Sequence, residues 1–250
     1  VLSRAKSLLK NYYTYYTFMD INKSTRIQTS ILNAAEKKAL VWLAKRQPKC
    51  INSDHLTFIG FLGAVIIGAG YVLSNLDIRW LWLSCFGFLV NWYGDSLDGT
   101  LARVRNQQRP TYGYYLDHMM DAVNECIMFI CVGLSSFIKF PIAIAALLLY
   151  LLLSMNVNMN NHLRGEFKLT YIKLGPTEFR IIVVLINILI IAVKPLRDFL
   201  WNINILGHDL ALSFFDIAGI GIVILLFFVF FVSFFNDARY YSKIDPRKKN

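Results

Sequence analysis

Cysteine and acidic side chains are both scarce in this sequence of 250 residues. The four cysteines, Cys50, Cys85, Cys126 and Cys131, lack the close spacing of a metal-binding motif, and three of them lie inside apolar runs. We therefore assign them no chemistry and interpret those three as small buried residues. No internal repeat, low-complexity tract or second domain is evident along the chain.

Charge is missing altogether from long stretches of the chain. Residues 56–76 and 80–94 contain no charged side chain. Apolar runs of this kind approach the ~20 residues that an α-helix needs to cross the hydrocarbon core of a bilayer. Hydrophobic residues make up 56% of the chain and the mean hydropathy is +0.46, whereas soluble domains are about 45–50% apolar. An ordinary water-soluble fold is excluded, and an integral membrane protein is expected.

The apolar runs predict an all-α integral membrane protein with six transmembrane helices. We expect spans at residues 56–76, 80–94, 113–138, 140–163, 177–193 and 210–235, the second continuing as a helix beyond residue 94. Residues 31–46 have the pattern of an amphipathic juxtamembrane helix, which we expect to lie on the membrane surface. The domains expected are a cytoplasmic segment (residues 1–50), a six-helix membrane domain (51–238) and a basic tail (239–250).

The excess of Lys and Arg over Asp and Glu, 26 to 16, falls mainly in segments that flank apolar runs. This distribution fits membrane orientation and lipid phosphate better than a nucleic-acid footprint. By the positive-inside rule, both termini and the connections after the second and fourth spans are expected in the cytoplasm.

Four aspartates border the connection between the second and third expected spans: Asp95, Asp98, Asp117 and Asp121. The first two are three residues apart and the last two are four apart, so each pair shares one face of its helix. A short connection makes the two helices antiparallel neighbours, which brings the four carboxylates together at the cytoplasmic end. Charges held so closely need cations, and an all-oxygen ligand set suits Mg²⁺, Mn²⁺ or Ca²⁺ rather than zinc.

Small residues on the same helix faces indicate space for a ligand beside the aspartates. Gly99, Ala102 and Gly113 allow a bulky group to approach the backbone closely. Metal ions, space and the guanidinium of Arg103 together indicate a substrate that carries phosphate.

The pattern D-x2-D-G-x2-A-R-x9-G-x3-D-x3-D, from Asp95 to Asp121, resembles the signature of the CDP-alcohol phosphotransferase (CDP-alcohol phosphatidyltransferase) family. Residues 51–60 are similar to the family's stretch before its first span, although Ser53 and Asp54 stand where Pro-Asn is often found. Residues 175–180 resemble a motif of some members. The similarity covers roughly residues 30–240.

The resemblance implies a transferase of phospholipid biosynthesis and an expected role for each site residue. Asp95, Asp98, Asp117 and Asp121 would bind Mg²⁺ or Mn²⁺, with room for two ions, and Asp121 would also deprotonate the attacking hydroxyl. The CDP moiety would be bound by Gly99, Ala102, Arg103 and Gly113. A homodimer embedded in membrane lipids is expected, with no nucleic-acid partner.

The residues leave several alternatives open. CDP-diacylglycerol could react with a polar alcohol, or a CDP-choline or CDP-ethanolamine type of donor could react with a lipid alcohol. Glu125, Arg164 and Arg180 are candidates for binding the acceptor or a lipid phosphate, although membrane-flanking charge or a polar contact between helices also explains them. The aspartates could pair with neighbouring arginines, or could form the ion path of a membrane cation channel or transporter.

Overall fold

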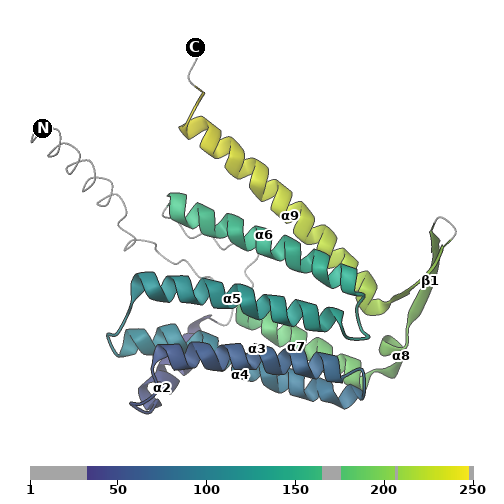
Figure 1. Ribbon diagram of the computed structural model, residues 1–250, viewed down its shortest axis with the longest axis horizontal. Coiled ribbons are helices and arrows are strands. Elements are labelled where there is room, and N and C mark those ends of the chain that lie inside the picture. Colours follow the sequence, from purple (N-terminus) through teal and green to yellow (C-terminus); the bar gives the residue numbers. More distant parts are fainter. Residues whose placement is uncertain (1–32, 165–175, 206–207, 248–250) are drawn as a thin grey trace, which may run out of the picture.

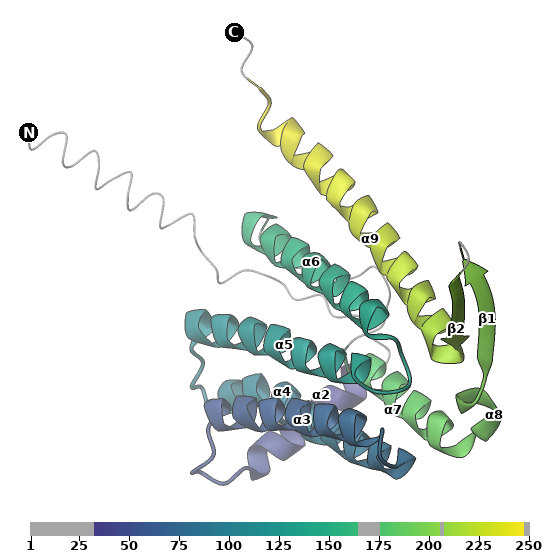
Figure 2. The ribbon, with the colours of Figure 1, turned by 45° about the vertical axis from the view of Figure 1, so that its right-hand side comes forward.

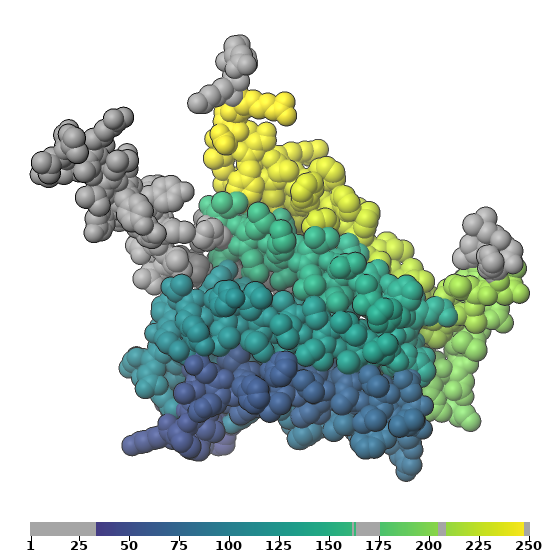
Figure 3. All heavy atoms as spheres, in the orientation of Figure 1, coloured from purple at the N-terminus to yellow at the C-terminus, as the bar shows by residue number. Residues whose placement is uncertain are grey.

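The computed structural model describes residues 33–164, 176–205 and 208–247, and they are mostly helical. Figure 1 shows the helices running side by side, and Figure 3 shows the same view with all atoms. The long helices are α3 (Ser53–Leu73), α4 (Leu81–Val104), α5 (Pro110–Gly133), α6 (Phe140–Arg164), α7 (Pro176–Ala192) and α9 (Phe214–Ile244). Of these, α3, α6 and α9 are long and apolar enough to cross a membrane, as expected of a membrane protein.

The helices α3 and α4 pack against each other through glycine, after a short connection that contains the 3₁₀ turn η2 (Ile78–Trp80). A Cβ atom added to Gly94 would lie 2.2 Å from the backbone nitrogen of Gly60, and one added to Gly63 would lie 2.3 Å from that of Asn91. The two backbones are therefore in direct contact, as small residues permit in membrane helices.

The helices α6 and α9 form a second pair, joined by polar side chains. Asn156 and Asn160 of α6 both donate hydrogen bonds to the carboxylate of Asp237, at 2.9 and 2.7 Å, and the Tyr241 hydroxyl donates to Asn160 at 2.7 Å. The helix α5 lies between the two pairs and packs against both α3 and α6. The helix α7 packs against α4.

The helix α2 (Asn33–Arg46) coincides closely with the predicted amphipathic helix and packs across α4. Its Leu40 and Ala44 are buried. Glu36 accepts hydrogen bonds from Trp92 of α4 at 2.9 Å and from Thr177 of α7 at 2.5 Å. These contacts fix α2 against α4 and α7, while its position at a membrane surface stays a prediction. The predicted basic segment before residue 33 lies outside the described residues.

The prediction of an all-α protein is wrong in one region. After the short helix α8 (Lys194–Arg197), strands β1 (Leu200–Ile205) and β2 (His208–Ser213) form an antiparallel hairpin. Residues 210–213, predicted to begin the last span, belong to β2, and α9 begins at Phe214. It begins there because Ser213 and Asp216 form a capping box, in which each side chain accepts a hydrogen bond from the other's backbone nitrogen. The helix predicted to reach residue 138 ends at Gly133.

Candidate active site

The candidate site lies where α4 ends and α5 begins. The helix α4 continues beyond the apolar residues to Val104, as predicted, and α5 starts at Pro110. The tight connection includes Asn106 with a φ of 54°, in the left-handed region that asparagine tolerates better than most residues. Proline in the first turn of α5 fits a position whose N–H has no partner within the helix. The aspartates of both helices thus come to the same end of the helix pair.

Three of the four aspartates form a compact group. Asp95, Asp117 and Asp121 each offer a carboxylate oxygen, and these oxygens lie within 4.8 Å of one another. All three residues are partly buried. A set of ligands that are all oxygen, partly withdrawn from water, has the chemistry that Mg²⁺ and Mn²⁺ require. The group fits a divalent cation, which would offset the repulsion among the carboxylates.

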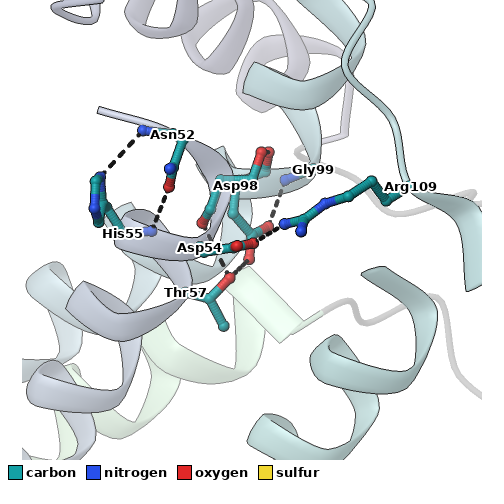
Figure 4. A network of polar contacts seen from close by, with 8 residues as sticks. Asn52, Asp54, His55, Thr57, Asp98, Gly99 and Arg109 are labelled. Atoms are coloured by element: carbon teal, nitrogen blue, oxygen red, sulfur yellow. Dashed lines mark hydrogen bonds and ion pairs between the residues drawn. The ribbon is translucent and has the colours of Figure 1, made fainter. Parts of the chain in front are cut away.

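Asp98 lies beside this group and has partners of its own on α3. Its carboxylate accepts a hydrogen bond of 2.6 Å from the Thr57 hydroxyl, and its backbone carbonyl accepts one of 3.0 Å from Ser53. Figure 4 shows Asp98 and Thr57 facing each other in this network. The first turns of α3 therefore hold Asp98 at the edge of the cluster.

A cation from α7 reaches the acidic group. The Arg180 guanidinium forms an ion pair with Asp95, and its Nε donates to the amide oxygen of Asn91 at 3.1 Å. The amide nitrogen of Asn91 donates in turn to the Gly60 carbonyl at 2.9 Å. Asp95 is thus oriented by a chain of contacts that joins α7, α4 and α3.

The aspartates face a cavity of about 930 Å³. All four line it, together with the residues predicted to bind the CDP moiety: Gly99, Ala102, Arg103 and Gly113. A Cβ atom at Gly113 would meet nothing within 4 Å, so this glycine leaves open space rather than a close contact within the protein. At Gly99, an added Cβ would lie 3.4 Å from the guanidinium of Arg103, which also donates to Thr100 at 3.0 Å. The cavity is large enough for a nucleotide.

Two arginines tie the connection between α4 and α5 to the start of α3. Arg109 forms an ion pair with Asp54 at the rim of the cavity (Figure 4), and this hydrogen-bonded partner raises the pKa of the Arg109 guanidinium. Arg105 donates to the backbone carbonyls of Gln47, Pro48 and Ile51. The rim of the cavity is therefore cross-linked by charge-assisted hydrogen bonds.

The three candidate acceptor residues have different positions. Arg180 lines the cavity and contacts the acidic group. Glu125 lies one turn further along α5, is absent from the cavity wall among the described residues, and has Tyr150 of α6 as a hydrogen-bond partner. Arg164 is the last residue of α6, and its side chain lies outside the described part of the structure.

Sequence reasoning gave no role to Thr57, Ser53 or Asn91, which position the aspartates. Asn91 offered a signal, because it is a polar residue inside an apolar run and lies four positions before Asp95, on the same helix face. Thr57 and Ser53 belong to the stretch before the first span that resembles the family. Their contacts with Asp98 depend on how α3 packs against α4, which the spacing of residues does not reveal.

In a comparison with known protein families, residues 51–215 match the family described as CDP-alcohol phosphatidyltransferase. The matched region includes the four aspartates, the predicted CDP-binding residues, Arg180 and the hairpin. No curated protein gives a significant match to the chain.

Proposed function

This chain belongs to the CDP-alcohol phosphatidyltransferase family, and from that premise we propose that it transfers a substituted phosphate group from a CDP-alcohol to an acceptor alcohol, with release of CMP. The family acts in phospholipid synthesis at membranes. The observation that carries the proposal is the group of Asp95, Asp117 and Asp121, whose oxygens lie within 4.8 Å of one another and face a cavity of about 930 Å³.

Asp95, Asp117 and Asp121, with Asp98 beside them, would bind one or two Mg²⁺ or Mn²⁺ ions. Bound divalent ions offset the negative charge of the diphosphate and of the departing CMP. The fit of the site supports this assignment, because its ligands are all oxygen and lie within 4.8 Å of one another. The bond network of Thr57 and Asn91 would keep the carboxylates in place as substrates enter and leave.

In the proposed reaction, Asp121 accepts the proton of the acceptor hydroxyl. The acceptor oxygen then bonds to the phosphorus that carries the donor alcohol, and the bond from this phosphorus to the bridging oxygen of CMP breaks. The bridging oxygen leaves with CMP, and the donor alcohol stays on the phosphate that is transferred. General-base assistance of this kind contributes typically about 10²–10⁴-fold to the rate.

We assign the nucleotide to the cavity wall formed by Gly99, Ala102 and Gly113. The open space in front of Gly113 supports this assignment, since any side chain there would occupy room that the ligand needs. Arg103 lies on the same wall and would share the charge of the diphosphate.

Two arrangements of donor and acceptor are proposed alternatives. Either CDP-diacylglycerol donates a phosphatidyl group to a polar alcohol, or a CDP-choline or CDP-ethanolamine type of donor transfers its head group to a lipid alcohol. Arg180, Arg164 and Glu125 are the proposed acceptor residues. For Arg180, the ion pair with Asp95 supports a second role in orienting that carboxylate. Weaker binding of the acceptor in an Arg180 variant would favour a role in acceptor binding. A lower kcat alone would favour a role in orienting Asp95.

We propose that α3, α4, α5, α6, α7 and α9 all cross the membrane, with the aspartate ends and both termini in the cytoplasm. The antiparallel course of neighbouring helices and the basic residues near the aspartate end support this orientation. A homodimer is proposed on the family resemblance.

The proposed function is tested with purified protein, Mg²⁺ or Mn²⁺, and a panel of CDP-alcohols, each offered with polar and lipid alcohols. Release of CMP is measured together with mass spectrometry of the lipid product. We expect one donor and acceptor pair to yield CMP and a new phosphodiester in equal amounts. No CMP from any pair, combined with cation flux into vesicles that contain the protein, would instead support a channel or transporter.

A further inference from the structure

The hairpin of β1 and β2 has one apolar face and one polar face. Its register places Trp201 opposite Leu212 and Ile203 opposite Leu210. Residues directly opposite each other in an antiparallel pair point to the same side of the sheet, so these four side chains share one face. The other face carries Asn202, the hydrogen-bonded pair of Asn204 and Asp209, and Ala211, with Leu200, 64% exposed, at the base of the hairpin.

Much of the apolar face is exposed in the isolated chain. Trp201 is 54% exposed and Leu210 is 40% exposed, whereas Leu212, next to the base of the hairpin, is only 6% exposed. A lone two-stranded hairpin is at best marginally stable in water, and it needs a covering for its apolar side. The exposed apolar face therefore indicates an environment that is not bulk water.

The base of the hairpin is held firmly against the membrane helices. The hydroxyl of Ser213 donates to the Phe137 carbonyl at 2.9 Å, and Asp216 accepts a hydrogen bond of 2.7 Å from the backbone nitrogen of Lys139. Both Phe137 and Lys139 belong to the connection between α5 and α6. Figure 2 shows the hairpin beside the first turns of α9. Its orientation relative to the helices is thus set by these bonds.

The hairpin lies at the end of the helices opposite to the aspartates. The helix α5 begins beside the aspartates and ends at Gly133, near the connection that contacts Ser213. The strand β2 leads directly into α9, which is long and apolar enough to span a bilayer and begins at Phe214. A hairpin joined without a spacer to the start of a span lies at the depth of the lipid head groups.

We propose that the hairpin is an interfacial anchor, which rests its apolar face on the acyl chains of the bilayer that the helices cross. Trp201 suits this depth, because tryptophan prefers the boundary between lipid and water. Lys194 of α8 is exposed just before the hairpin and would contact lipid phosphate. The polar face, with Asn204 and Asp209, remains in water. The anchor requires a membrane-spanning α9 and does not depend on the proposed transferase activity.

Single cysteine labels on the two faces test the anchor. In a background with the four native cysteines replaced by alanine, Ile203→Cys and Leu210→Cys report the apolar face, and Asn202→Cys and Ala211→Cys are matched controls on the polar face. Each variant carries an environment-sensitive fluorophore and is reconstituted in vesicles of phosphatidylcholine and phosphatidylglycerol. We expect brominated lipids to quench the labels on the apolar face and aqueous iodide to quench those on the polar face.

Equal quenching by iodide on both faces would overturn the anchor. So would apolar-face labels that neither quencher reaches, because that outcome indicates a protein partner, such as a second copy of the chain. A second measurement uses the protein's own tryptophan emission, so it does not depend on whether the cysteine variants fold. Trp201→Phe in the otherwise unchanged protein is expected to reduce the tryptophan emission that brominated lipids quench, and an unchanged quenched fraction would also overturn the proposal.

Discussion

The pair of α3 and α4 differs sharply from the pair of α6 and α9. Within the most apolar stretch of each helix, the share that is buried inside the protein is 44% for α3, 17% for α6 and 11% for α9. Glycines bring the backbones of α3 and α4 into contact, whereas Asn156, Asn160 and Asp237 join α6 to α9 through side chains at one end. The closer packing is therefore in the pair that carries Asp95 and Asp98.

This difference has a consequence for the candidate site. Carboxylates that bind one metal ion must keep their spacing within a few tenths of an ångström, and backbone contact between helices provides that rigidity. Asp95 and Asp98 both lie on α4, next to the glycine contacts with α3. The pair of α6 and α9 faces mainly outward, where lipid can serve as its solvent. Four sets of substitutions can break or sharpen this contrast.

The largest loss of activity is expected when a carboxylate of the candidate site is replaced. Asp121→Asn removes the proposed base and a metal ligand, so CMP release should fall by about 10²–10⁴-fold. Asp237→Asn changes a carboxylate in the pair of α6 and α9 and should leave CMP release close to that of the unchanged protein. Both variants are compared at the same protein and metal concentrations. Full activity of the Asp121 variant would remove the basis for the assigned base.

The second largest loss of activity is expected when Arg180, the cation that orients Asp95, is replaced. Arg180→Ala breaks the contacts with Asp95 and Asn91, and CMP release at saturating metal should fall by roughly 10–100-fold, the usual range for partners of metal ligands. Arg180→Lys keeps the charge but loses the planar guanidinium that contacts both residues, so it should recover only part of the activity. An alanine variant as active as the unchanged protein would rule out both proposed roles of Arg180.

The glycine contacts give a matched pair of stability tests. A Cβ at Gly94 would lie 2.2 Å from Gly60 and 2.5 Å from the Leu56 carbonyl, so Gly94→Ala must force α3 and α4 apart. Overpacking of this kind costs about 1–3 kcal/mol. Gly221→Ala on α9 meets nothing within 4 Å and should leave the stability unchanged or slightly higher, because alanine favours a helix more than glycine does. Thermal unfolding in detergent compares the two, and equal melting temperatures would contradict the proposed contrast between the helix pairs.

The smallest effect is expected at the polar contacts of α6 and α9. Tyr241→Phe removes the hydroxyl that donates a hydrogen bond of 2.7 Å to Asn160 and keeps the aromatic ring. Such bonds in membrane proteins average about 0.6 kcal/mol, so the melting temperature should drop only slightly. If Tyr241→Phe destabilised the protein as much as Gly94→Ala, the polar contacts would matter as much as the glycine packing.

The sequence predicted α3, α6 and α9 because each is a long apolar run, and it predicted α4, α5 and α7 because each contains a shorter apolar run. The spacing of the aspartates also predicted that α4 and α5 bring them to one end, and Asp95, Asp117 and Asp121 do meet there. The hairpin escaped prediction because its strands are short and the second one merges with the apolar run of α9. Signals for it were the alternation of apolar and polar residues over 201–205, typical of a strand, and Ser213 followed by Asp216, the capping-box pattern that marks the true start of α9.

Contacts between distant parts of the chain could not be predicted from spacing. Arg180 lies 85 residues from Asp95, and Thr57 lies 41 residues from Asp98. Which cation reaches which carboxylate depends on how α7 and α3 pack against α4. Periodicity shows which face of a helix is polar, but it does not show which neighbour that face meets.

Binding of Mn²⁺ to the purified protein tests the central claim most directly. Electron paramagnetic resonance can count bound Mn²⁺ without any substrate, so the result does not depend on knowing the donor or the acceptor. We predict that the unchanged protein binds Mn²⁺, that replacing Asp95 and Asp117 together by asparagine abolishes the binding, and that Asp237→Asn retains it. Equal binding by all three proteins would contradict a metal centre built from these aspartates.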